Sequence, residues 1–239
     1  MGYGANSDGT VAQLTELAGS GEIDAVFHNG DISYADGDQH HWDVYFRKIE
    51  PIASTVPYLT TPGNHEFWFN FSAYKHRVAM PMAEKFDSMF YSIDIGSVHI
   101  LAMNTETVID KAGMSKEQVA WIRLNLATAR ASPRTRFKVA FGHRPLYTSA
   151  HGGNDVPAGN AVLQGLVEDI LITEEVDLVV QAHIHDYGAQ QTALSLSPSL
   201  SLSLSLFLLV LPASTRVRQS VRLIALGGLL VALQSARFR

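Results

Sequence analysis

Short apolar runs alternate with segments of helical spacing along the first 186 residues of this chain. Apolar residues recur every three or four positions in 10–20, 42–52, 115–131 and 160–175. Apolar runs of strand length occupy 24–28, 56–60, 90–95, 98–103, 137–141 and 176–181. The alternation of the two patterns predicts a mixed α/β fold.

Two local features sharpen this prediction. Gly96-Ser97 separates two of the apolar runs and predicts a hairpin between them. Ser115 is followed three residues later by Gln118, the spacing of a capping box, which predicts that a helix begins there.

The pattern changes after residue 186. Serine and leucine alternate from Leu194 to Leu206 almost without interruption, broken only at Pro198. This period of two fits an amphipathic strand. Ser-Leu repeats are also what a repeated TC dinucleotide encodes, and we favour this second interpretation, in which the tail is a gene-model error such as read-through into non-coding sequence.

Charge supports a boundary near residue 190. The stretch 187–239 contains five arginines and no acidic residue, although the whole chain has a formal net charge of −5. We therefore predict a partial catalytic domain over 1–189 and a tail over 190–239 that is not a native domain. The apolar runs at 206–211 and 223–233 are shorter than the ~20 residues that span a bilayer, so we expect no association with a membrane.

Composition narrows the chemistry. A pI of about 6.0 indicates no surface for binding polyanions, so we expect no nucleic-acid partner. The chain has no cysteine, so any bound metal must be held by oxygen and nitrogen atoms. Composition does not predict an oligomeric state.

Residues that bind metals follow four of the predicted strands. They are Asp31 and Tyr34, then Asn64 with His65, then His143, and finally His183 with His185. Loops at strand ends are where α/β proteins place their sites, so we expect these side chains to converge at one edge of a sheet. Carboxylate, phenolate, amide and imidazole groups together suit two adjacent metal ions, and such pairs cleave phosphate esters.

Taken singly, these residues have ordinary structural interpretations. Asp31 with Tyr34 reads as a loop acid beside a packed tyrosine, and an isolated histidine is more often a core or surface residue than a ligand. We assign that ordinary role to the remaining histidines outside the loops, namely His28, His40, His41, His76 and His99. The metal prediction depends on the ordered set as a whole.

The ordered set resembles the calcineurin-like metallophosphoesterases, and among them the purple acid phosphatases. Their pattern is Asp-x-Gly, Gly-Asp-x-x-Tyr, Gly-Asn-His-Glu/Asp, a histidine after a strand, and Gly-His-x-His. The resemblance covers residues 1 to about 187 and includes the segments 33–36, 62–66 and 143–147. Tyr34 separates the chain from protein Ser/Thr phosphatases, whose corresponding loop continues with Asp-Arg-Gly.

This resemblance implies a fold and an activity. The fold is a metallophosphoesterase-type α/β/β/α sandwich of two mixed sheets, incomplete at its C-terminus. The activity is hydrolysis of phosphate monoesters, as an acid phosphatase, by a metal-bound hydroxide at a dinuclear site of Fe(III) and a divalent ion (Zn, Fe or Mn). The implied partner is a small phosphate ester, and the implied location is secreted or vacuolar, to which the sequon Asn70-Phe71-Ser72 adds weak support.

The resemblance also implies a role for each matching residue. Asp31 bridges both ions, Tyr34 and His185 bind the ferric ion, and the divalent ion is bound by Asn64, His143 and His183. His65 lies beside the substrate and either helps to protonate the leaving oxygen or holds the phosphate. His151 matches only loosely the region of the substrate-contacting histidines.

Two departures leave alternatives open. Met1-Gly2 matches the last two positions of Asp-x-Gly, so the resemblance implies that one carboxylate ligand of the iron is lacking. After His185 the usual Tyr-Glu-Arg is replaced by Asp186-Tyr187-Gly188. The alternatives are therefore a phosphodiesterase or nucleotidase of the same superfamily, or a non-catalytic fragment that binds metal poorly.

Overall fold

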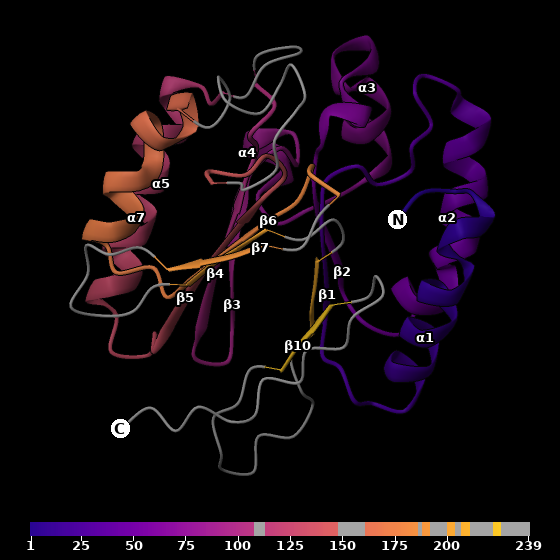
Figure 1. Ribbon diagram of the computed structural model, residues 1–239, viewed down its shortest axis with the longest axis horizontal. Coiled ribbons are helices and arrows are strands. Elements are labelled where there is room, and N and C mark those ends of the chain that lie inside the picture. Colours follow the sequence, from indigo (N-terminus) through magenta and orange to yellow (C-terminus); the bar gives the residue numbers. More distant parts are fainter. Residues whose placement is uncertain are drawn as a thin grey trace.

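Two mixed β-sheets pack face to face and helices cover their outer faces (Figure 1). The computed structural model describes residues 1–107, 113–147 and 161–185, together with the backbone of four short strands at 188–191, 200–203, 207–210 and 222–225. The predicted α/β/β/α sandwich is therefore confirmed.

The first sheet has the strand order β10-β9-β1-β2. Strands β1 (Val26–Asn29) and β2 (Tyr58–Thr61) are parallel, with Val26 opposite Tyr58. Helices α1 (Asp8–Gly19) and α2 (Gln39–Ala53) lie along its outer side (Figure 1). Helix α2 begins after Asp38, whose carboxylate accepts a hydrogen bond from the His40 N–H at 2.8 Å and so caps the helix.

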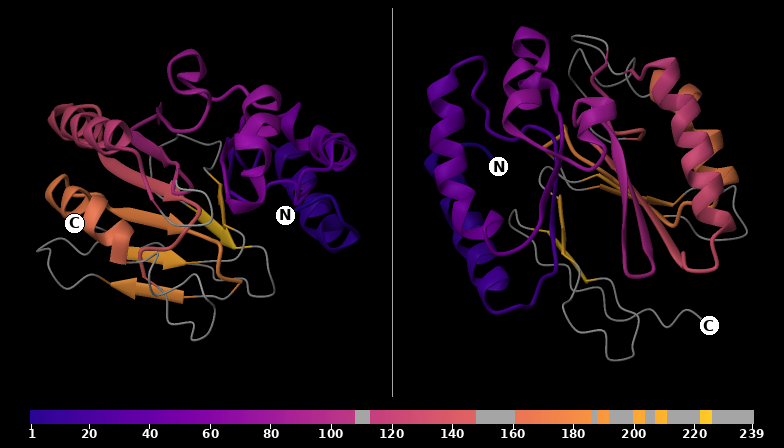
Figure 2. Two further views of the ribbon diagram at one scale, coloured as in Figure 1. Left: turned by 90° about the horizontal axis from the view of Figure 1, so that it is seen from above. Right: turned by 180° about the vertical axis from the view of Figure 1, so that it is seen from behind.

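The second sheet has the strand order β3-β4-β5-β6-β8-β7. Strands β3 (Tyr91–Ile95) and β4 (Val98–Met103) form the predicted antiparallel hairpin. Strands β4, β5 (Phe137–Gly142) and β6 (Leu178–Gln181) are parallel. Helices α5 (Lys116–Ala131) and α7 (Asp169–Thr173) cover the outer face of this sheet (Figure 2).

Several details differ from the sequence prediction. Helices α3 (Trp68–Arg77) and α4 (Ala83–Phe86) and the 3-10 turns η1 (Ala5–Ser7) and η2 (Asn64–Glu66) were not predicted. The single helix predicted over 160–175 contains a π-helical stretch, η3 (Gln164–Glu168), before α7.

Only half of the predicted capping box forms at the start of α5. The Ser115 hydroxyl accepts a hydrogen bond from the Gln118 N–H at 3.1 Å. The Gln118 side chain does not return to Ser115. It makes two 2.8 Å bonds with the backbone of Asn104 instead, which ties α5 to the loop after β4.

The tail contributes strands to both sheets. Strands β7 (Gly188–Gln191) and β8 (Leu200–Ser203) extend the second sheet beside β6, and β9 (Phe207–Val210) and β10 (Arg222–Ala225) extend the first beside β1. Strand β8 therefore agrees with the alternative of an amphipathic strand, which a period of two fits, and the interpretation of the tail as a gene-model error stays a prediction. The domain boundary near residue 190 stays a prediction.

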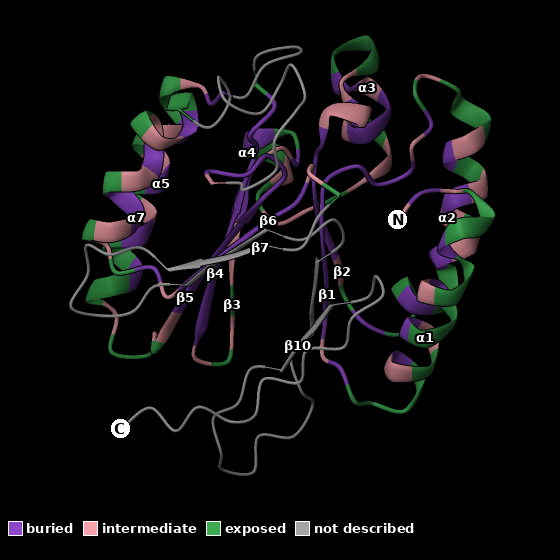
Figure 3. Ribbon diagram, viewed as in Figure 1, coloured by how far each residue is buried: buried purple, intermediate pink, exposed green. Residues whose placement is uncertain are grey.

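Apolar side chains fill three layers. Phe27, Leu59, Ile100 and Phe141 belong to the cluster between the two sheets. Separate clusters join each sheet to its own helices, so purple buried segments alternate with green exposed helix faces (Figure 3). Among the described residues, no helix is both long and apolar enough to cross a bilayer.

Candidate metal centre

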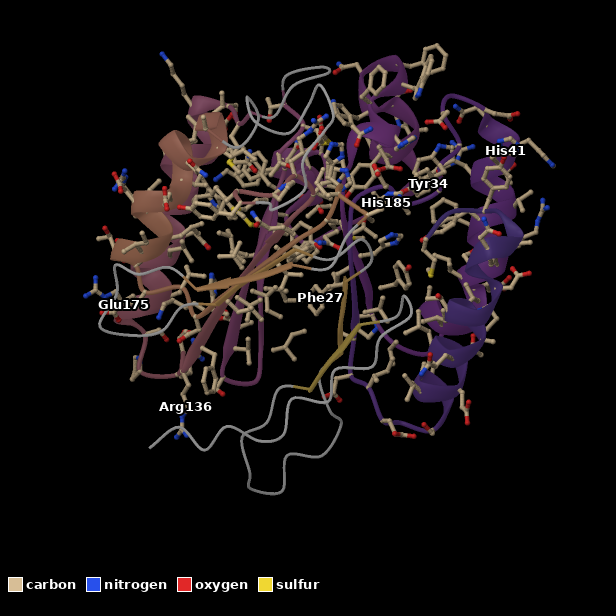
Figure 4. All side chains as sticks on the ribbon, viewed as in Figure 1. Phe27, Tyr34, His41, Arg136, Glu175 and His185 are labelled. Carbon is tan, nitrogen blue, oxygen red and sulfur yellow. The ribbon has the colours of Figure 1, made fainter. Side chains whose placement is uncertain are left out.

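The predicted ligands lie at the carboxyl ends of β1, β2, β5 and β6, as expected. Asp31 follows β1, Asn64 follows β2, His143 follows β5 and His183 follows β6. Tyr34 and His185, which are 151 positions apart in the chain, lie side by side at this edge (Figure 4). The structure thus brings together six of the predicted site residues, and their role in binding metal stays a prediction.

Four ligand atoms surround one point. His143 Nε2 and His183 Nδ1 each lie 2.9 Å from Asn64 Oδ1, and they lie 3.1 Å from one another. Asp31 Oδ1 lies 3.2 Å from His143 Nε2. Ligand atoms about 2.0–2.2 Å from a common ion stand roughly 3 Å apart, so these spacings fit a coordinated cation.

Hydrogen bonding orients the His143 ring. Its Nδ1 lies 3.0 Å from the backbone carbonyl oxygen of Asn29, which can only accept, so Nδ1 donates there. In the neutral imidazole Nε2 then carries a lone pair. That lone pair faces the amide oxygen of Asn64 and the carboxylate of Asp31. All three groups offer electron pairs, and a cation between them would stabilise the arrangement.

The His183 ring is kept neutral. Burial, with the nearby His143 imidazole, lowers its pKa to about 3. A neutral imidazole is the form that binds metals. His183 is therefore ready to act as a ligand throughout the neutral and mildly acidic range.

A second group of ligand atoms gathers around the other oxygen of Asp31. The Tyr34 hydroxyl donates to Asp31 Oδ2 at 3.3 Å and lies 3.2 Å from His185 Nε2. Burial and the Asp31 carboxylate raise the pKa of Tyr34, so only a strongly acidic cation would bind it as phenolate. Within the described ranges this second position has three donors, one fewer than the first.

Asp31 is ionised despite being buried. Burial alone would raise its pKa, but the imidazoles of His143 and His65 and the His65 N–H outweigh that effect, and the pKa is lowered. The carboxylate therefore keeps both oxygens available to accept or to coordinate at neutral pH.

The backbone at this edge is strained in a way typical of functional sites. Asp31, Tyr34 and His183 have φ values of 50°, 55° and 70°, in the left-handed region that side chains disfavour. The bend at His183 lets both histidines of the His-x-His pair reach the site. Gly63 permits close contact between loops, since a Cβ there would lie 2.3 Å from the Asp31 nitrogen.

His65 lies beside the two groups of ligand atoms. Its N–H donates to Asp31 Oδ1 at 3.2 Å, and its ring centroid lies 4.4 Å from that of Tyr34. Its Nδ1 is 2.5 Å from Asp36 Oδ1, a partner that sequence reasoning did not identify. His151 lies outside the described residues, so its predicted role stays a prediction.

Two of the histidines assigned an ordinary role are buried in hydrogen-bonded settings of their own. His28 Nδ1 lies 3.2 Å from the Tyr45 hydroxyl and 3.1 Å from that of Tyr58. His99 Nδ1 lies 2.6 Å from Asp94 Oδ1. Across the described part of the chain, the one cluster of acidic and imidazole groups with metal-binding spacing consists of Asp31, His143 and His183.

Comparisons with known proteins agree with this geometry. The sequence profile described as calcineurin-like phosphoesterase matches residues 4–187. Acid phosphatase type 7 from Homo sapiens is 34% identical over 197 residues, which cover 77% of this chain and 44% of that protein. A protein from Arabidopsis thaliana named probable inactive purple acid phosphatase 9 is 32% identical over 203 residues, which cover 72% of this chain and 30% of that one.

The fold agrees as well. The solved structure of purple acid phosphatase PPD1 from yellow lupin seeds superimposes with a TM-score of 0.68 and 26% identity, and the match covers 83% of this chain and 39% of that one. The chain therefore spans less than half the length of each of these three relatives.

Proposed function

Because this chain belongs to the calcineurin-like phosphoesterase family, we propose that its candidate metal centre hydrolyses phosphate esters. One observation carries the proposal above all others. The two oxygens of Asp31 face two separate groups of ligand atoms, which is the arrangement expected of a carboxylate that bridges two ions.

The donor chemistry indicates which ion each position prefers. Asn64, His143 and His183 offer amide oxygen and imidazole nitrogen, which suit a divalent ion such as Zn, Fe or Mn. Tyr34 and His185 offer a phenol and an imidazole, and the phenol calls for a harder ion such as Fe(III). When bound, such a pair of ions polarises a phosphate ester and supplies an activated water.

Two further side chains of the protein assist the departure of the leaving oxygen. His65 is half-buried beside Asp31 and is placed to give a proton to the departing oxygen of the ester. Asp36 accepts from His65 Nδ1 and fixes the orientation of the ring. Because the activated water attacks and His65 protonates the leaving oxygen, no covalent intermediate on the protein is needed.

Phosphate monoesters at acidic pH are the substrates we propose, in keeping with the acid phosphatases among the relatives. A small phosphate ester is the proposed partner. The second ligand group has three donors within the described residues, so we expect one ion to bind tightly and the other weakly. If the weaker position stays empty, the chain lacks the second ion, and this favours the alternative of a non-catalytic fragment.

Metal analysis and a substrate comparison test the proposal. The purified chain should bind at least one ion and hydrolyse p-nitrophenyl phosphate faster at pH 5 than at pH 7.5. The phosphodiester bis(p-nitrophenyl) phosphate should react more slowly, and the opposite preference would favour a phosphodiesterase. His183→Ala should abolish turnover, whereas the exposed His76→Ala should not change it; equal activity of the two variants would refute the assignment of the site.

A further inference from the structure

Glu66 is a buried carboxylate that connects two loops. Its side chain is 2% exposed and lies within the short turn η2. One carboxylate oxygen, Oε1, accepts a hydrogen bond from the Ile32 N–H at 2.9 Å, and the other, Oε2, accepts one from the Gly63 N–H at 2.8 Å. One side chain therefore satisfies two buried backbone donors that are 31 positions apart.

Those two donors flank candidate ligands. Ile32 follows Asp31 directly, and Gly63 directly precedes Asn64. The same two loops also touch elsewhere, because the His65 N–H donates to Asp31 Oδ1 at 3.2 Å. Holding Ile32 and Gly63 at a fixed separation therefore also holds Asp31 and Asn64 at a fixed separation.

We propose that Glu66 is a positioning residue for the metal centre, which sets the spacing between Asp31 and Asn64. The inference rests on the proposed metal centre and adds a residue that binds neither ion. The N–H groups of Ile32 and Gly63 lie in different loops, and each donates to its own oxygen of the Glu66 carboxyl group. An amide of the same size has one acceptor oxygen and would direct its NH₂ group at the other N–H.

The chain provides a matched control at the opposite end of the second sheet. Asp177 Oδ2 accepts a hydrogen bond from the Lys138 N–H at 2.7 Å, near the amino ends of β5 and β6. Asp177→Asn makes the same chemical change as Glu66→Gln, in a carboxylate that also holds a backbone N–H. It lies far along the strands from the carboxyl ends that carry the ligands.

Zinc titration of the metal-free full chain by calorimetry tests the proposal. We expect Glu66→Gln to raise the Zn²⁺ dissociation constant by about 10- to 100-fold, the range for groups that orient metal ligands. Glu66→Asp keeps both acceptor oxygens on a shorter side chain and should fall between Glu66→Gln and the unaltered chain. Asp177→Asn should lower the melting temperature and leave zinc affinity unchanged. Excess Zn²⁺ should still saturate Glu66→Gln at the stoichiometry of the unaltered chain, which a collapsed site would not allow.

The outcomes separate the two proposals. An unaltered chain that binds no zinc would refute the metal centre itself. An unaltered chain that binds zinc, together with a folded Glu66→Gln of equal affinity, would overturn the role of Glu66 alone. If Glu66→Gln does not fold, Glu66→Asp decides, since an affinity equal to that of the unaltered chain would overturn the inference.

Discussion

Asp31 and Tyr34 are joined by the hydrogen bond from the Tyr34 hydroxyl to Asp31 Oδ2, 3.3 Å long, while the other carboxylate oxygen faces His143 Nε2 at 3.2 Å. Asp31 is thus the one described side chain that belongs to both groups of ligand atoms. Substitutions at this residue should affect both ions, whereas substitutions on either side should affect one.

Asp31→Asn removes the charge and leaves the shape. We expect both ions to be lost and activity to fall by more than about 100-fold, since groups outside the coordination sphere already cost ~10–100-fold. Equilibrium titration with each metal ion and a phosphatase assay measure the two effects. The exposed Asp87→Asn serves as a control, and retention of both ions by Asp31→Asn would contradict the bridging role.

Tyr34→Phe should affect one ion. A tyrosinate bound to Fe(III) absorbs visible light, so protein loaded with ferric iron should be coloured and the variant should lack that band. The divalent ion should stay bound, because Asn64, His143 and His183 are unchanged. Absorption spectra measure the band, and Tyr3→Phe, at a half-buried tyrosine outside the candidate ligands, is the control.

His65→Ala should act according to the leaving group. Loss of a general acid typically costs ~10²–10⁴-fold, and the loss should be largest for alkyl phosphates, whose oxygen must be protonated as it departs. With p-nitrophenyl phosphate the loss should be much smaller, because its leaving group departs as an anion. Steady-state rates with both substrates measure the difference, and an equal loss with both would argue against proton transfer.

Gly63→Ala should disturb the site through the backbone. The added Cβ would lie 2.3 Å from the Asp31 nitrogen and 2.4 Å from its Oδ1, so Asp31 must shift. We expect weaker metal binding and a lower melting temperature. Gly9→Ala, in the open flank of α1, is the control and should stabilise the chain by up to about 1 kcal/mol. Normal zinc affinity in Gly63→Ala would show that the loop relaxes without moving Asp31.

His28 should make the fold sensitive to acid. Burial lowers its pKa well below the usual value of 6.5, so below pH 6.5 the unfolded chain takes up a proton that the folded chain does not. Stability is therefore lost as the pH falls. Between pH 7 and pH 5 this one residue should contribute up to about 2 kcal/mol of the loss.

Urea unfolding of His28→Asn and of the unaltered chain, both with chelator and at both pH values, measures this contribution. The variant should lose less stability over that interval. Equal losses in the two proteins would show that His28 titrates in the folded state.

Much of the candidate site was predictable because its candidate ligands follow short apolar runs of the sequence. Asp31, Asn64, His143 and His183 each follow an apolar run, and parallel strands bring such positions to one edge. The strands themselves were found because their periodicity is local. The structure shifts their ends by at most two residues, and β4 has the predicted ends.

What the sequence did not predict depends on contacts between distant segments. Glu66 accepts a hydrogen bond from the N–H of Ile32, 34 positions earlier, and the spacing of the residues does not predict that bond. Helix α3 was missed because Phe69 and Asn70 adopt left-handed backbone angles inside an aromatic run without helical periodicity. The tail strand β8 was set aside because its pairing with β6 is not visible in a repeat of two residue types.

The candidate ligands are divided between the two sheets. Asp31 and Asn64 come from the sheet of β1 and β2, whereas His143 and His183 come from the sheet of β5 and β6. An ion held by all four would cross-link the halves of the sandwich much as a disulfide joins two loops. Its binding free energy would then add to the cohesion of the whole protein, and removing it with a chelator would loosen the seam between the sheets before either sheet came apart.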